Sequence, residues 1–265
     1  MFDNSMETEA IPERVYSLCQ ILKNGKMDEK EVRALIEPNL KSSSYFGTVR
    51  DAAKQLALIS NDEDSKQLEL IVGEEVIANY SSFRRYINSN IEKLSGGQFY
   101  KTVQTYMYNS GALFRIDKDL LNVSKAINVI HEYNPNLNLD VDNMRAWRFW
   151  ATFLGFGYLH NMFFLPNAAT FLKDIIYHSG VVKGKTYTID EFVSMLHPSI
   201  KICLSQADES NRKMNLALSN AFRTLNDLGI IELQNVNDRS DEWNMVNMSL
   251  HPFSATITDV VYKGE

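Results

Sequence analysis

The side chains with the most reactive chemistry are scattered along this chain. No histidine stands at a metal-ligand spacing from a Cys, Asp or Glu. The two cysteines, Cys19 and Cys203, are isolated among apolar neighbours, a pattern typical of buried free thiols and not of a disulfide framework or a zinc site. Asp140 and Asp142 come closest to a pair of catalytic carboxylates, although one of them is expected to cap a helix. We therefore expect no enzyme, no metal and no cofactor; the alternative is an enzyme whose carboxylates converge in the middle of the chain.

Residues 94–98 spell LSGGQ, which is letter for letter the signature motif of the ATP-binding-cassette ATPases. In that family the motif resembles a helix start that contacts nucleotide bound on the opposing subunit. Such an ATPase also needs a Walker A loop, Gly-x-x-x-x-Gly-Lys-Ser/Thr, and this chain contains none. We interpret residues 94–98 as a turn between helices, in which Gly96 and Gly97 supply positive φ angles.

A repeat gives the strongest indication of the fold. Residues 28–38 align without gaps on residues 188–198, with a capping residue, a glutamate, an apolar triplet and a final proline in register. Residues 49–59 likewise align on 221–231, which places Ala57 opposite Gly229. Each copy continues into a polar loop and a β-like segment. This order is typical of a winged helix-turn-helix, so we predict a mainly α protein with small β wings, in which two such modules flank a helical middle region.

The first module is predicted from the residues that start and end its helices. A helix begins at Pro12 and stops before residues 24–25 (NG), and a second begins after the cap Asp28 and ends at Pro38. Residues 42–44 offer a cap for a third helix, and a polar tip at 61–65 precedes a wing strand at 68–71.

The remaining elements follow from apolar spacing. In the middle region we predict helices over 74–94, 99–108 and 118–133, one that starts at 143 after the cap Asp142, and one over 168–177. The helix that starts at 143 is predicted to carry Trp147 and Trp150 on its inward side, as part of the core. In the second module Thr188 caps a helix that ends near 196, residues 211–228 form the longest helix, and Gly229 ends it in the left-handed conformation. A hairpin is predicted to pair 230–233 with 243–246. The domains are then a flexible N-terminal segment (1–11), module 1 (12–72), the middle region (73–186) and module 2 (187–265).

Charge separates these regions more clearly than the net value of −6 suggests. The net charges are −3 for residues 1–11, −1 for 12–72, +3 for 73–186 and −5 for 187–265. The most apolar window, residues 149–166, is too short and too interrupted to span a membrane, and the acidic start differs from a signal peptide. We expect a cytoplasmic protein without a membrane partner.

The third helix of a helix-turn-helix normally enters the major groove of DNA, so its outward residues are candidate contacts. The acidic tips at 62–64 and 238–242 oppose this, because carboxylates there would face phosphates. The outward side of each third helix is predicted to be polar, and the middle region adds basic residues. The candidate contacts for nucleic acid or a partner are Thr48, Arg50, Lys54, Arg84, Arg85, Arg145, Arg148, Asn215, Ser219 and Arg223.

Two resemblances guide the functional expectation. The duplicated modules resemble the tandem winged-helix subunits that bind kleisins in chromosome-organising ATPase complexes, which are scaffolds. Residues 150–157 (WATFLGFG) and 165–167 (LPN) resemble accessory proteins of bacterial phage-defence operons. Neither resemblance carries over a functional residue. Together they imply a non-catalytic accessory subunit of a prokaryotic, defence-related complex that docks onto a larger nuclease, helicase or ATPase encoded nearby. Double-stranded DNA is a candidate second partner, and the alternative function is a sequence-specific transcriptional regulator.

Overall fold

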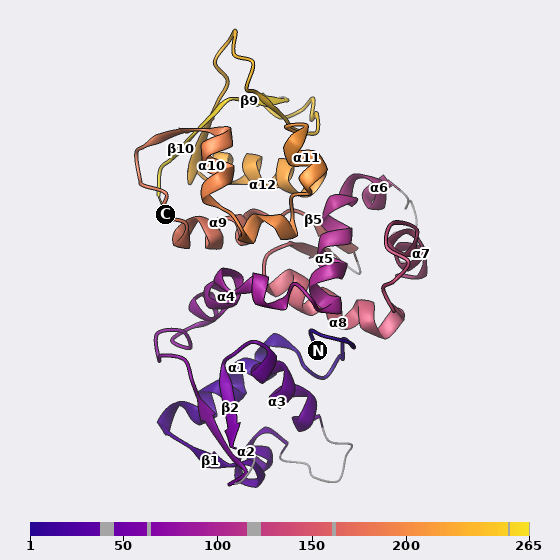
Figure 1. Cartoon of the computed structure of the whole chain (residues 1–265), viewed down its shortest axis with the longest axis vertical. Helices are drawn as coiled ribbons and strands as arrows, with labels where there is room; N and C mark the ends of the chain where they lie inside the picture. Colours follow the sequence, from indigo (N-terminus) through magenta and orange to yellow (C-terminus); the bar gives the residue numbers. More distant parts are fainter. Residues whose placement is uncertain (38–44, 63–64, 116–122, 161–162, 254, 265) are drawn as a thin grey trace.

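The computed structural model describes residues 1–37, 45–62, 65–115, 123–160, 163–253 and 255–264. These residues form a mainly helical protein with small antiparallel sheets. Residues 12–72 lie at one end of the long axis of the molecule, the C-terminal elements lie at the other end, and helices from the middle of the chain join them (Figure 1).

The elements of residues 12–72 follow the order helix, strand, helix, helix, strand, strand. The three strands form a sheet in the order β1-β3-β2, so the last strand lies at its centre. Val15, Val49 and Leu68 are fully buried between the helices and this sheet. The elements are α1 (Pro12–Ile21), η1 (Leu22–Asn24), β1 (Met27–Asp28), α2 (Glu29–Ile36), α3 (Phe46–Gln55), β2 (Ile59–Asp62) and β3 (Gln67–Leu70).

The middle of the chain is helical and ends in a two-stranded hairpin. Its core is aromatic: Trp147 and Trp150 are fully buried, and Trp147 lies 4.7 Å from the Phe164 ring between centroids. The elements are α4 (Tyr80–Ser89), η2 (Ile91–Leu94), α5 (Gln98–Tyr108), α6 (Ser110–Arg115), α7 (Val123–Tyr133), α8 (Val141–Phe153), β4 (Gly157–His160) and β5 (Phe163–Pro166).

The C-terminal part repeats the order helix, strand, helix, helix, strand, strand, with two additions. Its sheet has the order β6-β10-β7, again with the last strand at the centre. The additions are a short helical insertion before the third helix and a small hairpin before the last strand. The elements are α9 (Ala169–His178), β6 (Thr186–Thr188), α10 (Ile189–Met195), η3 (Ser199–Ile202), α11 (Gln206–Ser210), α12 (Leu216–Asp227), β7 (Ile231–Gln234), β8 (Trp243–Asn244), β9 (Thr256–Ile257) and β10 (Asp259–Tyr262).

Several predicted helix ends are confirmed because they depend on local capping. The Asp28 side chain accepts a hydrogen bond of 2.8 Å from the backbone N–H of Lys30. Thr188 and Glu191 form a complete capping box at the start of α10. Gly229 follows α12 with a φ of 69°. The cap predicted at residues 42–44 and the start of the helix predicted over 118–133 lie outside the described residues.

Three predicted helix starts are wrong, and in each case a different residue provides the cap. The helix predicted from residue 74 begins at Tyr80, because Asn79 caps it with a bond to the Ser82 N–H. Asp140 caps α8, and not Asp142. The helix predicted over 211–228 begins after the cap Asn215, and with 12 residues it is shorter than α8, which has 13.

The predicted hairpin between residues 230–233 and 243–246 is also wrong. β7 pairs with β10 from Ile231↔Tyr262 to Gln234↔Asp259. Trp243 is held elsewhere, since its indole N–H donates to Asp190 of α10 at 2.6 Å and its strand β8 pairs with β9. The true partner strand, DVVY at 259–262, was overlooked although its two valines favour β structure.

The segment 1–11, predicted to be flexible, is packed against the rest of the protein. Phe2 and Ala10 are fully buried and Met6 is 1% exposed. Phe2 makes edge-on contacts with the rings of Phe99 and Trp150, at centroid distances of 5.2 and 4.9 Å. We call residues 1–10 the N-terminal strap.

The strap also explains the glycines of the LSGGQ sequence. Gly97 has a φ of −85°, so the prediction of a positive φ is wrong for it, and Gly96 has no positive φ either. A Cβ on Gly97 would lie 2.2 Å from the carbonyl oxygen of Phe2. Gly97 therefore permits the close approach of the strap to the start of α5.

The aligned residues Ala57 and Gly229 yield a first prediction on stability. Both have left-handed backbones, with φ angles of 53° and 69°. This conformation costs an L-residue roughly 1–2 kcal/mol, and only part of that is offset by the lower entropy of the unfolded alanine chain. We expect Ala57→Gly to raise the free energy of unfolding by about 0.5–1 kcal/mol, and Gly229→Ala to lower it by a similar amount. Urea denaturation of both variants checks this; equal signs for the two changes would contradict it.

Candidate interaction surfaces

The outer side of α3 carries three of the predicted contact residues, and two of them are engaged within the chain. The Thr48 hydroxyl donates to Glu7 of the strap at 2.8 Å. Arg50 forms ion pairs with Glu29 at 2.6 Å and with Asp51 at 2.9 Å. Lys54 alone of the three is exposed with no ion pair to a described residue.

The predicted contact residues of α12 are buried or hydrogen-bonded within the chain, in contrast to their predicted outward position. Ser219 is fully buried, and its hydroxyl accepts from the Val246 N–H at 2.9 Å. Arg223 is 3% exposed and donates to the carbonyl oxygens of Val246 at 2.8 Å and Phe253 at 3.2 Å.

Asn215 is committed in the same way, because it caps α12 and donates to the Cys203 carbonyl at 2.6 Å. On the other side of the helix, the Ala217 N–H donates to Ser110 of α6 at 3.2 Å, and Asn220 donates to the Pro166 carbonyl at 3.0 Å. The chain itself therefore covers α12 from two sides.

Arg84 and Arg85 meet a fully buried carboxylate, Asp174 of α9. Arg84 donates to it twice, at 2.7 and 3.1 Å, and Arg85 lies 3.5 Å away. Asn88 adds a hydrogen bond of 2.8 Å to the same carboxylate. We call these four residues the Asp174 cluster. It joins α4 to α9, so these two predicted contact residues have a structural role.

Arg145 and Arg148 lie one turn apart on α8 but in different surroundings. Arg145 is exposed and pairs with Asp142 at 2.9 Å. Arg148 is 8% exposed, and burial lowers the pKa of its guanidinium. Among the described residues its Nε has no hydrogen-bond partner. The two arginines therefore do not form a basic track with Arg84 and Arg85.

The strap lies between α3 and the helices α5 and α8, and we call the site that it occupies the groove. The backbone N–H groups of Gln98 and Phe99 donate to the carbonyls of Asp3 and Phe2, at 2.6 and 3.1 Å. Asn143 donates to the Met6 carbonyl at 3.0 Å and Trp150 to the Ala10 carbonyl at 2.5 Å.

The α3 side of this groove contributes Gln55, which is bonded twice to the strap. Its carbonyl oxygen accepts from the Phe2 N–H at 2.8 Å, and its amide donates to the Asp3 carboxylate at 2.9 Å. Gln55 and Thr48 therefore bind two of the three strap carboxylates, those of Asp3 and Glu7. Helical periodicity predicts Trp150 as a core residue but not as a strap contact, and no sequence motif marks Asn143 as a binding residue.

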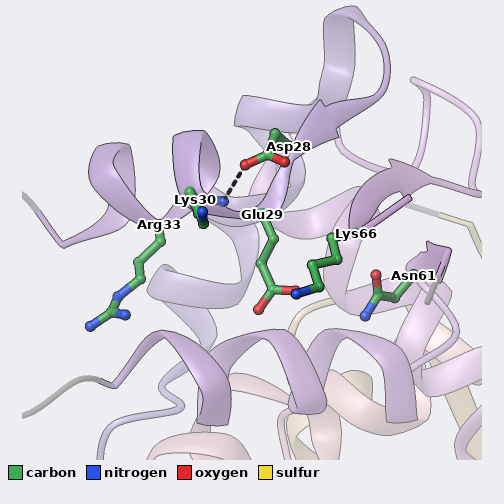
Figure 2. Close-up of a pocket in the computed structure, with 6 residues that line it drawn as sticks. All are labelled: Asp28, Glu29, Lys30, Arg33, Asn61 and Lys66. Carbon is green, nitrogen blue, oxygen red and sulfur yellow. Dashed lines mark hydrogen bonds between the residues drawn. The ribbon is translucent and has the colours of Figure 1, made fainter. Parts of the chain in front are cut away.

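A polar pocket of about 360 Å³ lies where α2 begins beside β2 and β3. Figure 2 shows its residues Asp28, Glu29, Lys30, Arg33, Asn61 and Lys66. Both acidic side chains already have partners within the chain, since Asp28 caps α2 and Glu29 forms an ion pair with Arg50. Lys30 and Lys66 are exposed at its rim. The pocket can attract an anion only weakly, since its charges of both signs nearly balance.

A second pocket, of about 500 Å³, lies between α5 and the insertion that only the C-terminal copy has. His197 Nε2 lies 2.8 Å from the Glu209 carboxylate there. Tyr108 donates to the Lys201 carbonyl at 2.5 Å. A second pair joins His251, in the segment between β8 and β9, to Asp227 at the end of α12, at 3.1 Å. Sequence spacing could not reveal either pair, because the partners come from separate elements.

The described residues contain no group of three or more His, Cys, Asp or Glu side chains able to hold a metal ion. Burial raises the pKa of the Cys19 thiol to about 12 and also raises that of Cys203. Asp140 and Asp142 do not converge on one another, since the first caps α8 and the second pairs with Arg145.

Within the residues that the structure covers, no helix is both long and apolar enough to cross a membrane.

Comparisons with known proteins identify no relative of this chain. Searches with protein-family models, curated proteins and solved structures give no match to this chain.

Proposed function

We propose that this protein is a non-catalytic accessory or scaffold subunit of a prokaryotic, cytoplasmic multi-protein complex, which docks onto a larger nuclease, helicase or ATPase. Each end of the chain is then a winged helix-turn-helix. The shared element order, and the sheet orders β1-β3-β2 and β6-β10-β7, support this assignment. The link to phage defence depends only on the resemblance of residues 150–157 and 165–167.

One observation carries the proposal: the chain covers the polar side of both third helices. The strap engages Thr48 and Gln55 of α3, and main-chain groups near residues 246 and 253 engage Ser219 and Arg223 of α12. A helix reads bases only when its polar side chains can enter the major groove. Helices covered in this way serve packing, which leaves other surfaces for a partner.

Purification from the native host tests the docking role. We expect a tagged full-length chain to bring down one or more larger proteins encoded near its gene, in fixed stoichiometry and resistant to moderate salt. A chain that purifies as a lone monomer, and that binds none of the proteins encoded nearby, would overturn the proposal.

The alternative is a sequence-specific DNA-binding regulator, and the exposed cations Lys54, Lys30 and Lys66 favour it. A DNA-binding protein that makes 6–10 phosphate contacts loses roughly 10³–10⁵-fold in affinity between 50 and 200 mM salt. We expect the full-length chain to bind a mixed-sequence duplex with a Kd weaker than about 10⁻⁴ M at 150 mM salt, the weak end of non-specific binding. Fluorescence anisotropy at several salt concentrations measures this. Tight, salt-sensitive binding that Lys54→Ala weakens would favour the regulator.

A further inference from the structure

The strap is bound in its groove in the manner of a peptide ligand. Five of its main-chain carbonyls, those of Phe2, Asp3, Met6, Glu9 and Ala10, accept hydrogen bonds from outside the strap. Four of the donors belong to α5 or α8 and the fifth is Arg14 of α1, so none of the five belongs to a neighbouring strand. Phe2 supplies the anchor, because its fully buried ring contacts two other aromatic rings.

The groove also offers hydrogen-bond donors to two carboxylates of the strap. Asp3 and Glu7 accept from Gln55 and Thr48 of α3, at 2.9 and 2.8 Å, and the strap contains no basic residue. Gly97 has no Cβ, and this lets the Phe2 carbonyl approach the start of α5. A Cβ on Gly97 would lie 2.2 Å from the Phe2 carbonyl oxygen. The ligand that fits is therefore an acidic segment with an aromatic residue next to its first carboxylate.

We propose that this groove is a peptide-binding site occupied in cis by residues 1–10, and that an acidic, phenylalanine-bearing segment of the partner subunit takes their place during docking. This inference rests on the proposed docking function and names the chemistry of the partner. A tethered segment acts at an effective concentration on the order of mM, so exchange is visible only when the strap is weakened or cut.

The first experiment uses the full-length Phe2→Ala chain and a fluorescent peptide of residues 1–10. We expect saturable binding, at least tenfold tighter than to the wild-type chain, whose own strap competes. A peptide with Asp3→Asn and Glu7→Gln should bind at least tenfold more weakly. A peptide with Glu9→Gln should bind unchanged, because within the described parts of the chain the Glu9 carboxylate accepts only from Thr8 of the strap. Absence of binding, or binding insensitive to Asp3 and Glu7, would overturn the inference.

A second version of the experiment does not depend on correct folding of the Phe2→Ala chain. A protease site inserted between Ala10 and Ile11 of the wild-type chain allows the strap to be cut after folding. The cut chain should exchange its strap for the labelled peptide, and failure to exchange would overturn the site. If partners co-purify but no peptide exchanges, the groove assignment is wrong and the docking function stands. If the peptide exchanges but no partner co-purifies, the groove is a peptide-binding site and the docking function is wrong.

Discussion

Asp174→Ala is expected to lower the free energy of unfolding by about 3–5 kcal/mol, the range observed when one partner of a buried ion pair is removed. Asp174 is fully buried and accepts from Arg84 and Asn88. Without it, the guanidinium of Arg84 and the amide of Asn88 lose their shared acceptor. Urea denaturation followed by circular dichroism measures the change.

The matched control for this prediction is Asp142→Ala. Asp142 also pairs with an arginine at 2.9 Å, but both side chains are more than half exposed. Exposed pairs contribute little because water screens them, so the control should remain close to wild type. If the two variants lose the same stability, the Asp174 cluster does not have the structural role assigned to it.

Gly97→Ala is expected to cost about 1–3 kcal/mol, the usual range for forcing an extra group into a well-packed site. The new Cβ would lie 2.2 Å from the Phe2 carbonyl oxygen and 2.9 Å from its carbon, and both are backbone atoms. The strap must therefore move away, and the Gln98 and Phe99 amides lose their acceptors. Hydrogen exchange at these two amides should accelerate along with the loss of stability.

Gly96→Ala is the control, one residue earlier in the same turn. A Cβ on Gly96 meets nothing within 4 Å, so its effect should stay within about 0.5 kcal/mol, as for ordinary surface changes. Normal exchange at Gln98 and Phe99 in Gly97→Ala would show that the strap does not depend on this close approach.

The parts of the fold that sequence analysis predicted well are those decided by neighbours in the chain. Asp28 and Thr188 act as caps within a few residues of themselves, and Gly229 adopts its left-handed angle in place. Apolar spacing also identified Trp147 and Trp150 as core, since helical periodicity is local.

The parts that it missed depend on contacts between distant residues. Ser219 and Arg223 are polar, so periodicity predicted them to face outward. The main-chain groups that bury them lie 23–30 residues further along the chain. β7 finds its partner strand beyond an intervening hairpin. The strap is short and acidic, and nothing in it predicted a binding groove made by residues as far away as Trp150.

The central position of β10 has a consequence for how the protein is made. Chains emerge from the ribosome N-terminal end first, and domains often fold as they emerge. The sheet of β1, β3 and β2 can close once residue 70 has emerged, whereas the β6-β10-β7 sheet lacks its middle strand until residue 262 has been synthesised. The strap precedes Trp150 in the chain, so its bond to the Trp150 indole can form only after residue 150 has emerged. Module 1 can thus acquire its core earlier in translation than the sheet at the opposite end of the molecule.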